Sequence, residues 1–91
     1  MICSIFTPSY KRKYFLEQFH KNLKNYLIKY NFEWIVPLEE DDTESIKFMR
    51  SIKSTRIRPV IGKFGGSAKA FSKCIKFAKG EYVSFSGDDD Y

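Results

Sequence analysis

Short apolar segments alternate with longer amphipathic segments, and this order constrains the fold more than any other feature of the chain. Four apolar segments are short enough to be buried strands: residues 2–6, 32–36, 57–61 and 82–85. Between them, apolar side chains recur at helical spacing in residues 11–30, 41–52 and 67–80. Strands that alternate with helices form a mostly parallel sheet with right-handed crossovers. The sequence therefore predicts a Rossmann-like α/β fold with about four strands and three helices.

Local signals predict where these elements begin and end. Pro37 is expected to stop the second strand, because a proline cannot donate a hydrogen bond to a sheet. Asp41 followed by Glu44 resembles a capping box for the second helix. Ser67 is expected to cap the third helix, and Gly80 is expected to end it.

Length and charge limit the classes of function. A chain of 91 residues with 43% hydrophobic residues is expected to form one small packed domain, residues 1–91. The 16 basic and 11 acidic residues give a net charge of +5. A basic surface attracts polyanions, which include nucleic acid, an anionic membrane face and phosphorylated small molecules. Charge alone does not choose among these partners.

Cysteine and histidine positions give no metal or redox motif. Cys3 and Cys74 lie in apolar surroundings and are expected to be reduced core thiols of an intracellular protein. His20 lies in the middle of a predicted helix and is interpreted as a surface histidine. No apolar segment approaches the roughly 20 residues of a membrane helix. The expected location is cytoplasmic, with at most peripheral contact at the inner membrane face.

Three consecutive acids near the end of the chain, Asp88–Asp90, need an explanation. Two unit charges about 4 Å apart repel by roughly 4 kcal/mol at an effective dielectric near 20. Water offsets this repulsion in a solvated acidic tail, and a divalent cation offsets it in a site. Carboxylate oxygens suit Mg²⁺ or Mn²⁺. The acids follow the fourth predicted strand, and open parallel sheets bind ligands outside the carboxyl ends of their strands.

The segment that joins the first strand to the first helix is a second candidate for ligand binding. The N–H groups of a helix start favour an anion, and Lys11, Arg12 and Lys13 add positive charge there. Tyr10 could stack on a base. An ordinary basic helix start is the alternative interpretation. The segment "GKFGGSAK" contains neither of the common glycine-rich phosphate-binding patterns.

Taken in order, these segments resemble the start of a family 2 glycosyltransferase with the GT-A fold. Residues 8–12, "PSYKR", are similar to the P-[TS]-Y-N-R loop of that family, and residues 33–36, "EWIV", are similar to its second strand. Residues 65–90 are similar to its Gly-Gly turn, its "AKGEY" segment and its D-x-D acidic motif. The resemblance covers the whole chain.

The resemblance implies a nucleotide-diphospho-sugar donor, a UDP-sugar above all, with Mn²⁺ or Mg²⁺ on its diphosphate. Glu39 lies near the family's second-strand acid, which contacts the base. Asp89 matches the metal-binding acid of the D-x-D motif, with Asp90 beside it as a second ligand and Asp88 on the substrate side. In this register the first acid of the motif falls at Gly87, whereas a one-residue slip would make Asp88 and Asp90 the pair. Other implied substrate-binding residues lie after the first strand: Thr7, Pro8, Ser9, Tyr10 and Arg12.

The family's domain is longer than this chain, which implies a truncated domain. The family adds acceptor-binding strands and a catalytic base, so transfer to an acceptor is expected only after completion by further chain or a partner. The sheet of the family also continues beside the fourth strand. That strand would here be an open edge that invites self-association, while Pro59 indicates that the third strand is the other edge.

Two alternatives remain beside this interpretation. One is a non-catalytic or degenerate nucleotide-binding fragment of a glycosyltransferase. The other is a small basic nucleic-acid binder, for which the chain has no matching motif and which its three consecutive acids oppose.

Overall fold

The computed structural model describes residues 3–85, and it confirms the predicted alternation of strands and helices. The elements are β1 (Cys3–Phe6), α1 (Lys13–Lys29), β2 (Phe32–Glu39), α2 (Thr43–Ser51), β3 (Ile57–Gly62), α3 (Ser67–Cys74) and β4 (Tyr82–Phe85). A short 3-10 turn, Ile75–Phe77, follows α3. Within this part of the chain, no helix is both long and apolar enough to cross a membrane.

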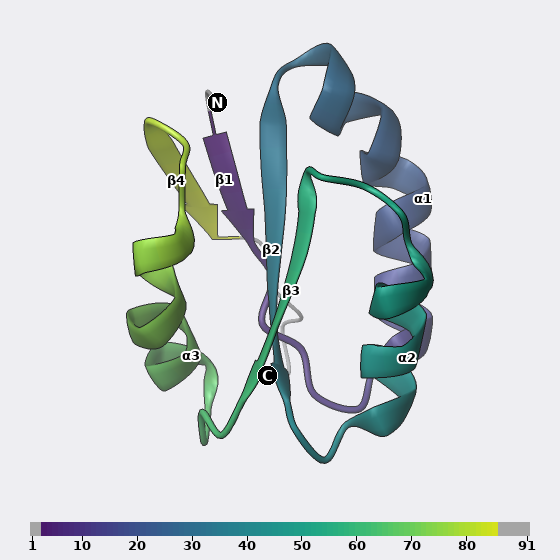
Figure 1. Ribbon diagram of the computed structural model, residues 1–91, viewed down its shortest axis with the longest axis vertical. Helices are drawn as coiled ribbons and strands as arrows, with labels where there is room; N and C mark the ends of the chain where they lie inside the picture. Colours follow the sequence, from purple (N-terminus) through teal and green to yellow (C-terminus); the bar gives the residue numbers. More distant parts are fainter. Residues whose placement is uncertain (1–2, 86–91) are drawn as a thin grey trace.

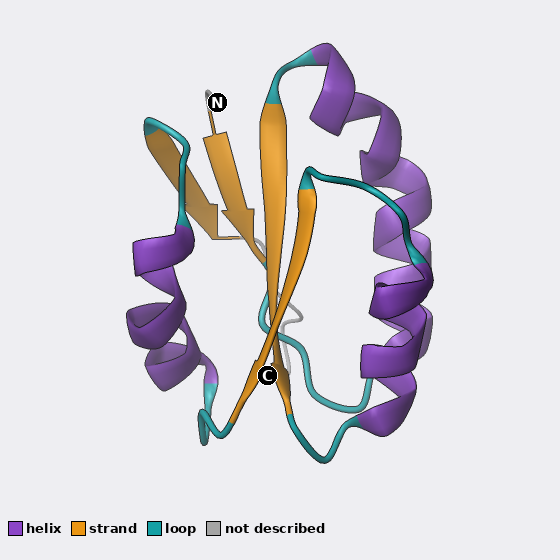
Figure 2. Ribbon diagram, in the orientation of Figure 1, coloured by secondary structure: helices purple, strands orange, loops and turns teal. Residues whose placement is uncertain are grey.

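The strands form one parallel sheet in the order β3-β2-β1-β4 (Figure 1). Helices α1 and α2 cover one face, and α3 covers the other (Figure 2). The chain moves from β1 to β2 to β3 in one direction and then returns to the far side of β1. The topological switch point therefore lies between β1 and β4. This arrangement confirms the predicted Rossmann-like α/β fold.

Two apolar cores lie on the two faces of the sheet. The core beneath α1 and α2 is built from Ile5, Leu16, Leu27, Trp34, Val36, Leu38, Met49 and Ile57. The core beneath α3 is built from Phe6, Ile35, Phe64, Ala70 and Cys74. Alternate residues of a strand point to opposite faces, so Trp34 and Val36 enter the first core while Ile35 enters the second. The thiols of Cys3 and Cys74 are free, and Cys74 is fully buried.

A buried polar cluster at the amino end of the sheet joins β1 and β2 to the segment that precedes β4. The Glu33 carboxylate on β2 accepts hydrogen bonds from the Ser4 hydroxyl and the Lys79 backbone N–H, both at 2.5 Å. Ser4 Oγ in turn accepts the Gly80 N–H at 2.8 Å. Glu33 is 2% exposed. The cluster fixes the segment that leads into β4 against β1 and β2.

The second strand continues past the residue that was expected to stop it. Pro37 lies inside β2, which ends only at Glu39. A proline lacks the N–H but keeps its carbonyl, and that carbonyl accepts the Ser9 N–H at 3.5 Å. The expectation that Pro37 stops β2 was wrong, because β2 still pairs through this carbonyl with the chain that follows β1. The expectation for Pro59 is confirmed, because β3 is an edge strand.

The expected helix caps differ from the observed ones. The N-cap of α2 is Asp42 rather than Asp41, and its side chain makes no capping bond. Its carboxylate instead accepts the Lys11 N–H at 2.7 Å. The N-cap of α3 is Gly66, so Ser67 is the first helical residue. Helix α3 ends at Cys74, before Gly80, which belongs to the buried polar cluster.

His20 is partly buried instead of lying on the open surface. Its ring stacks on Trp34, with ring centres 6.4 Å apart, and meets the edge of Phe48. Burial lowers the pKa of His20, and the positive charge of Lys24 lowers it further. The interpretation as a surface histidine was therefore wrong, because the stripe of apolar residues on α1 extends to this position.

Candidate functional site

The loop after β1 places only part of its predicted site residues at the surface. Thr7, Pro8 and Ser9 are buried, whereas Tyr10 and Arg12 are exposed. The Thr7 hydroxyl accepts the Trp34 indole N–H at 2.9 Å, which satisfies a buried donor of the core. The first three residues therefore pack the carboxyl edge of the sheet.

Two hydrogen bonds tie this loop to the loop after β2. The Tyr10 hydroxyl donates to Asp41 Oδ2 at 2.9 Å, and the Lys11 N–H donates to Asp42 Oδ2 at 2.7 Å. Lys11 adopts a φ of 55°, which turns its N–H toward the acid. The Tyr10 hydroxyl raises the pKa of the Lys11 ammonium, and the charges of Asp41 and Asp42 add to this effect. The two loops therefore form one connected rim.

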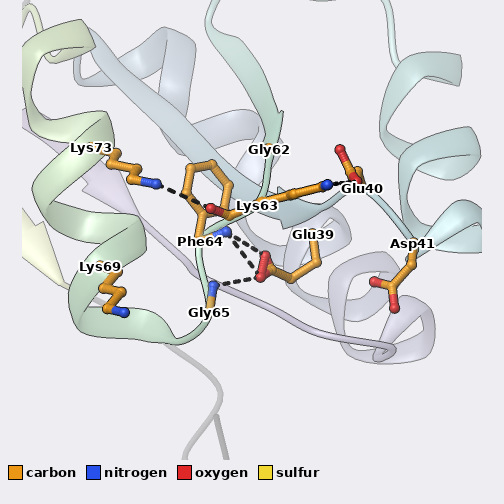
Figure 3. Close-up of a pocket in the computed structure, with 9 residues that line it drawn as sticks. All are labelled: Glu39, Glu40, Asp41, Gly62, Lys63, Phe64, Gly65, Lys69 and Lys73. Atoms are coloured by element: carbon orange, nitrogen blue, oxygen red, sulfur yellow. Dashed lines mark hydrogen bonds and ion pairs between the residues drawn. The ribbon is translucent and has the colours of Figure 1, made fainter.

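Glu39 connects the end of β2 to the loop after β3 (Figure 3). Its Oε1 accepts the Phe64 N–H at 3.0 Å and the Gly65 N–H at 2.7 Å, and its Oε2 also accepts the Phe64 N–H at 2.8 Å. Gly65 has a φ of 72°, which glycine adopts without strain. The carboxylate thus holds the turn that leads into α3.

An open cleft of about 520 Å³ lies between these loops at the carboxyl edge of β2 and β3. Acids line one side and lysines from the β3 loop and α3 line the other (Figure 3). Lys63 Nζ lies 3.4 Å from Glu40 Oε1, and Lys73 donates to the Lys63 carbonyl at 3.1 Å. The lining residues are Glu39, Glu40, Asp41, Gly62, Lys63, Phe64, Gly65, Lys69 and Lys73.

The acids that the sequence assigns to a metal, Asp89 and Asp90, lie outside the described residues, as does Asp88. Within residues 3–85, no group of three histidine, cysteine or acidic side chains is arranged to hold a metal ion. The acids after β2 already bind protein groups: Asp41 and Asp42 bind the β1 loop, and Glu40 pairs with Lys63. These acids therefore do not fit a divalent metal centre.

Sequence reasoning placed the acids after β2 at a ligand-binding edge but missed their partners. The contact between Glu39 and the Phe64–Gly65 turn joins residues 25 and 26 positions apart, which helical or strand periodicity does not reveal. The cleft-lining residues Lys63, Lys69 and Lys73 were also missed. The signal in the sequence was "GKFGGSAK", where Gly65 and Gly66 follow a strand and Lys63 and Lys69 lie on either side of them.

An open parallel sheet with helices on both faces and a cleft at its carboxyl edge defines the class of doubly wound α/β ligand-binding proteins. Residues 4–91 match the family described as glycosyl transferase family 2. The chain belongs to this family, as the resemblance of its sequence motifs implied. Neither the comparison with curated proteins nor that with solved structures gives a significant match.

Proposed function

We propose that this chain binds the nucleotide-diphospho-sugar donor of a glycosyltransferase at the carboxyl edge of its sheet. Membership of glycosyl transferase family 2 supports this proposal. The observation that carries it is the cleft between the loops after β2 and β3, which lies at the edge where open α/β sheets bind ligands. Its volume of about 520 Å³ is within the usual range for small-molecule sites.

The donor would span the edge from the cleft to the switch point. Its base would lie in the cleft beside Phe64 and the acidic rim, where both donors and acceptors are available. Its diphosphate would lie between the ends of β1 and β4, near Arg12. The direction of β4 supports this orientation, because β4 runs parallel to β1 toward the same edge.

Asp89 and Asp90 would hold the Mn²⁺ or Mg²⁺ ion, with Asp88 beside the substrate. Carboxylates are the ligands that these hard cations prefer. The ion would neutralise the diphosphate and stabilise it as a leaving group. Tyr10 and Arg12 would contribute contacts to the donor from the loop after β1, where both are exposed.

Transfer of the sugar to an acceptor would require further chain or a partner to supply the acceptor site. The open edge of β4 is the place where we propose that such a partner, or a second copy of the chain, adds to the sheet. In residues 3–85, β4 pairs on one side only, with β1.

Calorimetric titration of UDP, with and without Mn²⁺, tests donor binding. The proposal expects manganese-dependent binding by the chain and its loss in Asp89→Ala. A folded chain that binds UDP neither with nor without Mn²⁺ contradicts binding of a UDP-sugar. Titrations with GDP, TDP and CDP then separate another nucleotide from a degenerate, non-binding fragment.

A further inference from the structure

Two acids of the cleft, Glu39 and Asp41, differ in what they already bind. Both oxygens of Glu39 accept N–H groups of the Phe64–Gly65 turn, at distances between 2.7 and 3.0 Å. These are short, charge-assisted bonds from backbone donors whose positions are fixed by the chain. Figure 3 shows the carboxylate directed at that turn. Glu39 is therefore engaged before any ligand arrives.

Asp41 is held at one oxygen and open at the other. Its Oδ2 accepts the Tyr10 hydroxyl at 2.9 Å, and within residues 3–85 its Oδ1 has no hydrogen-bond partner. The residue is exposed and lines the cleft. An ionised carboxylate offers about four acceptor positions, so Asp41 can accept further N–H or O–H groups from a ligand.

We propose that Asp41, oriented by Tyr10, is the acid that accepts an N–H from the nucleobase of the donor, and that Glu39 is a positioning residue that shapes the Phe64–Gly65 turn. This inference rests on the proposed donor binding. It differs from the role that the family resemblance implies for Glu39. The base would present an imide N–H, as uracil does, to the open oxygen of Asp41.

In the alternative, Glu39 turns toward the base. The carboxylate then loses more hydrogen bonds than it gains. Turning the carboxylate would leave the N–H groups of Phe64 and Gly65 without their acceptor. A single new hydrogen bond to the base would replace the hydrogen bonds to both of these N–H groups. Binding through Asp41 needs no such exchange, because the residue is exposed at the cleft and, within residues 3–85, only its Oδ2 accepts a hydrogen bond.

Alanine variants of neighbouring acids give a matched test with two probes. The affinity for UDP with Mn²⁺ depends on contacts to both the base and the diphosphate. The affinity for inorganic pyrophosphate with Mn²⁺ depends on contacts to the diphosphate alone. Asp41→Ala is expected to weaken UDP binding about tenfold or more while leaving pyrophosphate binding unchanged, since a hydrogen bond to a charged group is lost. Glu44→Ala removes the same charge from an exposed residue of α2 that does not line the cleft, and it is expected to change UDP binding by less than about threefold, because salt screens exposed charges outside the site.

Two variants of Glu39 separate positioning from base contact. In Glu39→Gln, the remaining carbonyl oxygen can accept both turn N–H groups, as Oε1 does now, so UDP binding should stay within about threefold. Glu39→Ala removes the acceptor, and it should weaken UDP binding about tenfold or more and speed hydrogen exchange at the Phe64 and Gly65 amides. The exchange measurement uses the ligand-free chain and carries no information about donor binding.

The outcomes distinguish this inference from the proposed function. If Glu39→Gln weakens UDP binding tenfold with its amide protection intact while Asp41→Ala has no effect, Glu39 contacts the base and the inference is overturned. Unchanged protection of both amides in Glu39→Ala would overturn the positioning role. If the unaltered chain binds neither UDP nor pyrophosphate, the proposed function fails, and the role of Asp41 fails with it. The exchange data still decide the role of Glu39 in that case.

Discussion

Glu33 is a buried carboxylate whose hydrogen bonds come from a hydroxyl and a backbone N–H. The Ser4 hydroxyl and the Lys79 N–H each donate to the Glu33 carboxylate at 2.5 Å. In the sequence, Ser4 comes before the strand that carries Glu33 and Lys79 comes after it. A buried charge is tolerated only where it is well hydrogen-bonded. In this chain, Glu33 therefore holds the segment that leads into β4.

Removing this carboxylate should destabilise the fold. The loss should be larger when both acceptor oxygens are removed than when one remains. Glu33→Ala leaves the Ser4 hydroxyl and the Lys79 N–H without their acceptor, and we expect it to lower the free energy of unfolding by about 2–4 kcal/mol. Glu33→Gln keeps one oxygen for both donors and should cost less, about 1–2 kcal/mol. Urea unfolding followed by circular dichroism measures both values.

Glu17 provides the control for this prediction. It is a half-exposed acid on α1 whose carboxylate lies 4.0 Å from Lys13 Nζ. Surface pairs of this kind contribute little, so Glu17→Ala should change the free energy of unfolding by less than about 0.5 kcal/mol. If Glu33→Ala were no more destabilising than Glu17→Ala, the buried polar cluster would not hold β4 in place.

Strand β4 approaches β1 so closely that its preceding turn requires glycine. A Cβ atom on Gly80 would lie 2.6 Å from both the Cys3 carbonyl carbon and the Ser4 nitrogen, which are backbone atoms. Gly80→Ala must therefore push the start of β4 away from β1, and we expect a loss of about 1–3 kcal/mol in the free energy of unfolding. Hydrogen exchange at the amides that pair β1 with β4 should quicken with it.

A second glycine offers a matched comparison for this element. In Gly62→Ala the new Cβ would lie 3.1 Å from the ring of Phe64, which is a side chain and can shift by a few tenths of an ångström. The loss of stability should accordingly be smaller than in Gly80→Ala. Equal losses of stability in the two variants would mean that the close approach of β4 to β1 does not make Gly80 less tolerant of a side chain than Gly62.

The elements themselves could be predicted from sequence because each has its own local period. All four strands and all three helices lie where the apolar pattern placed them, and Pro59 correctly marked an edge. The errors came where contacts between distant residues override local signals. Pro37 stays in β2 through its carbonyl, Asp42 binds Lys11 instead of capping α2, and Gly80 serves the contact with β1.

The candidate site was predictable to the level of an edge of the sheet and no further. The alternation of elements places every strand's carboxyl end together, so the acids after β2 had to lie there. Which acid is held by the protein at both oxygens and which at one depends on side-chain partners more than 20 residues away. The bond between Tyr10 and Asp41 and the bonds of Glu39 to the β3 loop are of this kind.

At the scale of the whole molecule, the two edges of the described sheet are protected very differently. Strand β3 carries Arg58 and Pro59, and charge and proline both discourage pairing with another chain. Strand β4 has neither in its sequence, YVSF. Tyr82 and Val83 on it are 68% and 43% exposed, respectively. An open strand without such protection is the part of this fold most prone to extend the sheet.

We therefore expect the chain to self-associate through β4, and Val83→Lys to weaken this association at least tenfold. A lysine at an edge strand introduces charge repulsion between copies and removes an apolar contact. Sedimentation velocity over a range of concentrations measures the association. Ile28→Lys makes the same kind of change at a residue of α1 that is 73% exposed, and it should leave the association constant unchanged. Equal weakening by both substitutions would show that net charge governs association, and a chain that stays monomeric at high concentration would show that β4 does not extend the sheet by itself.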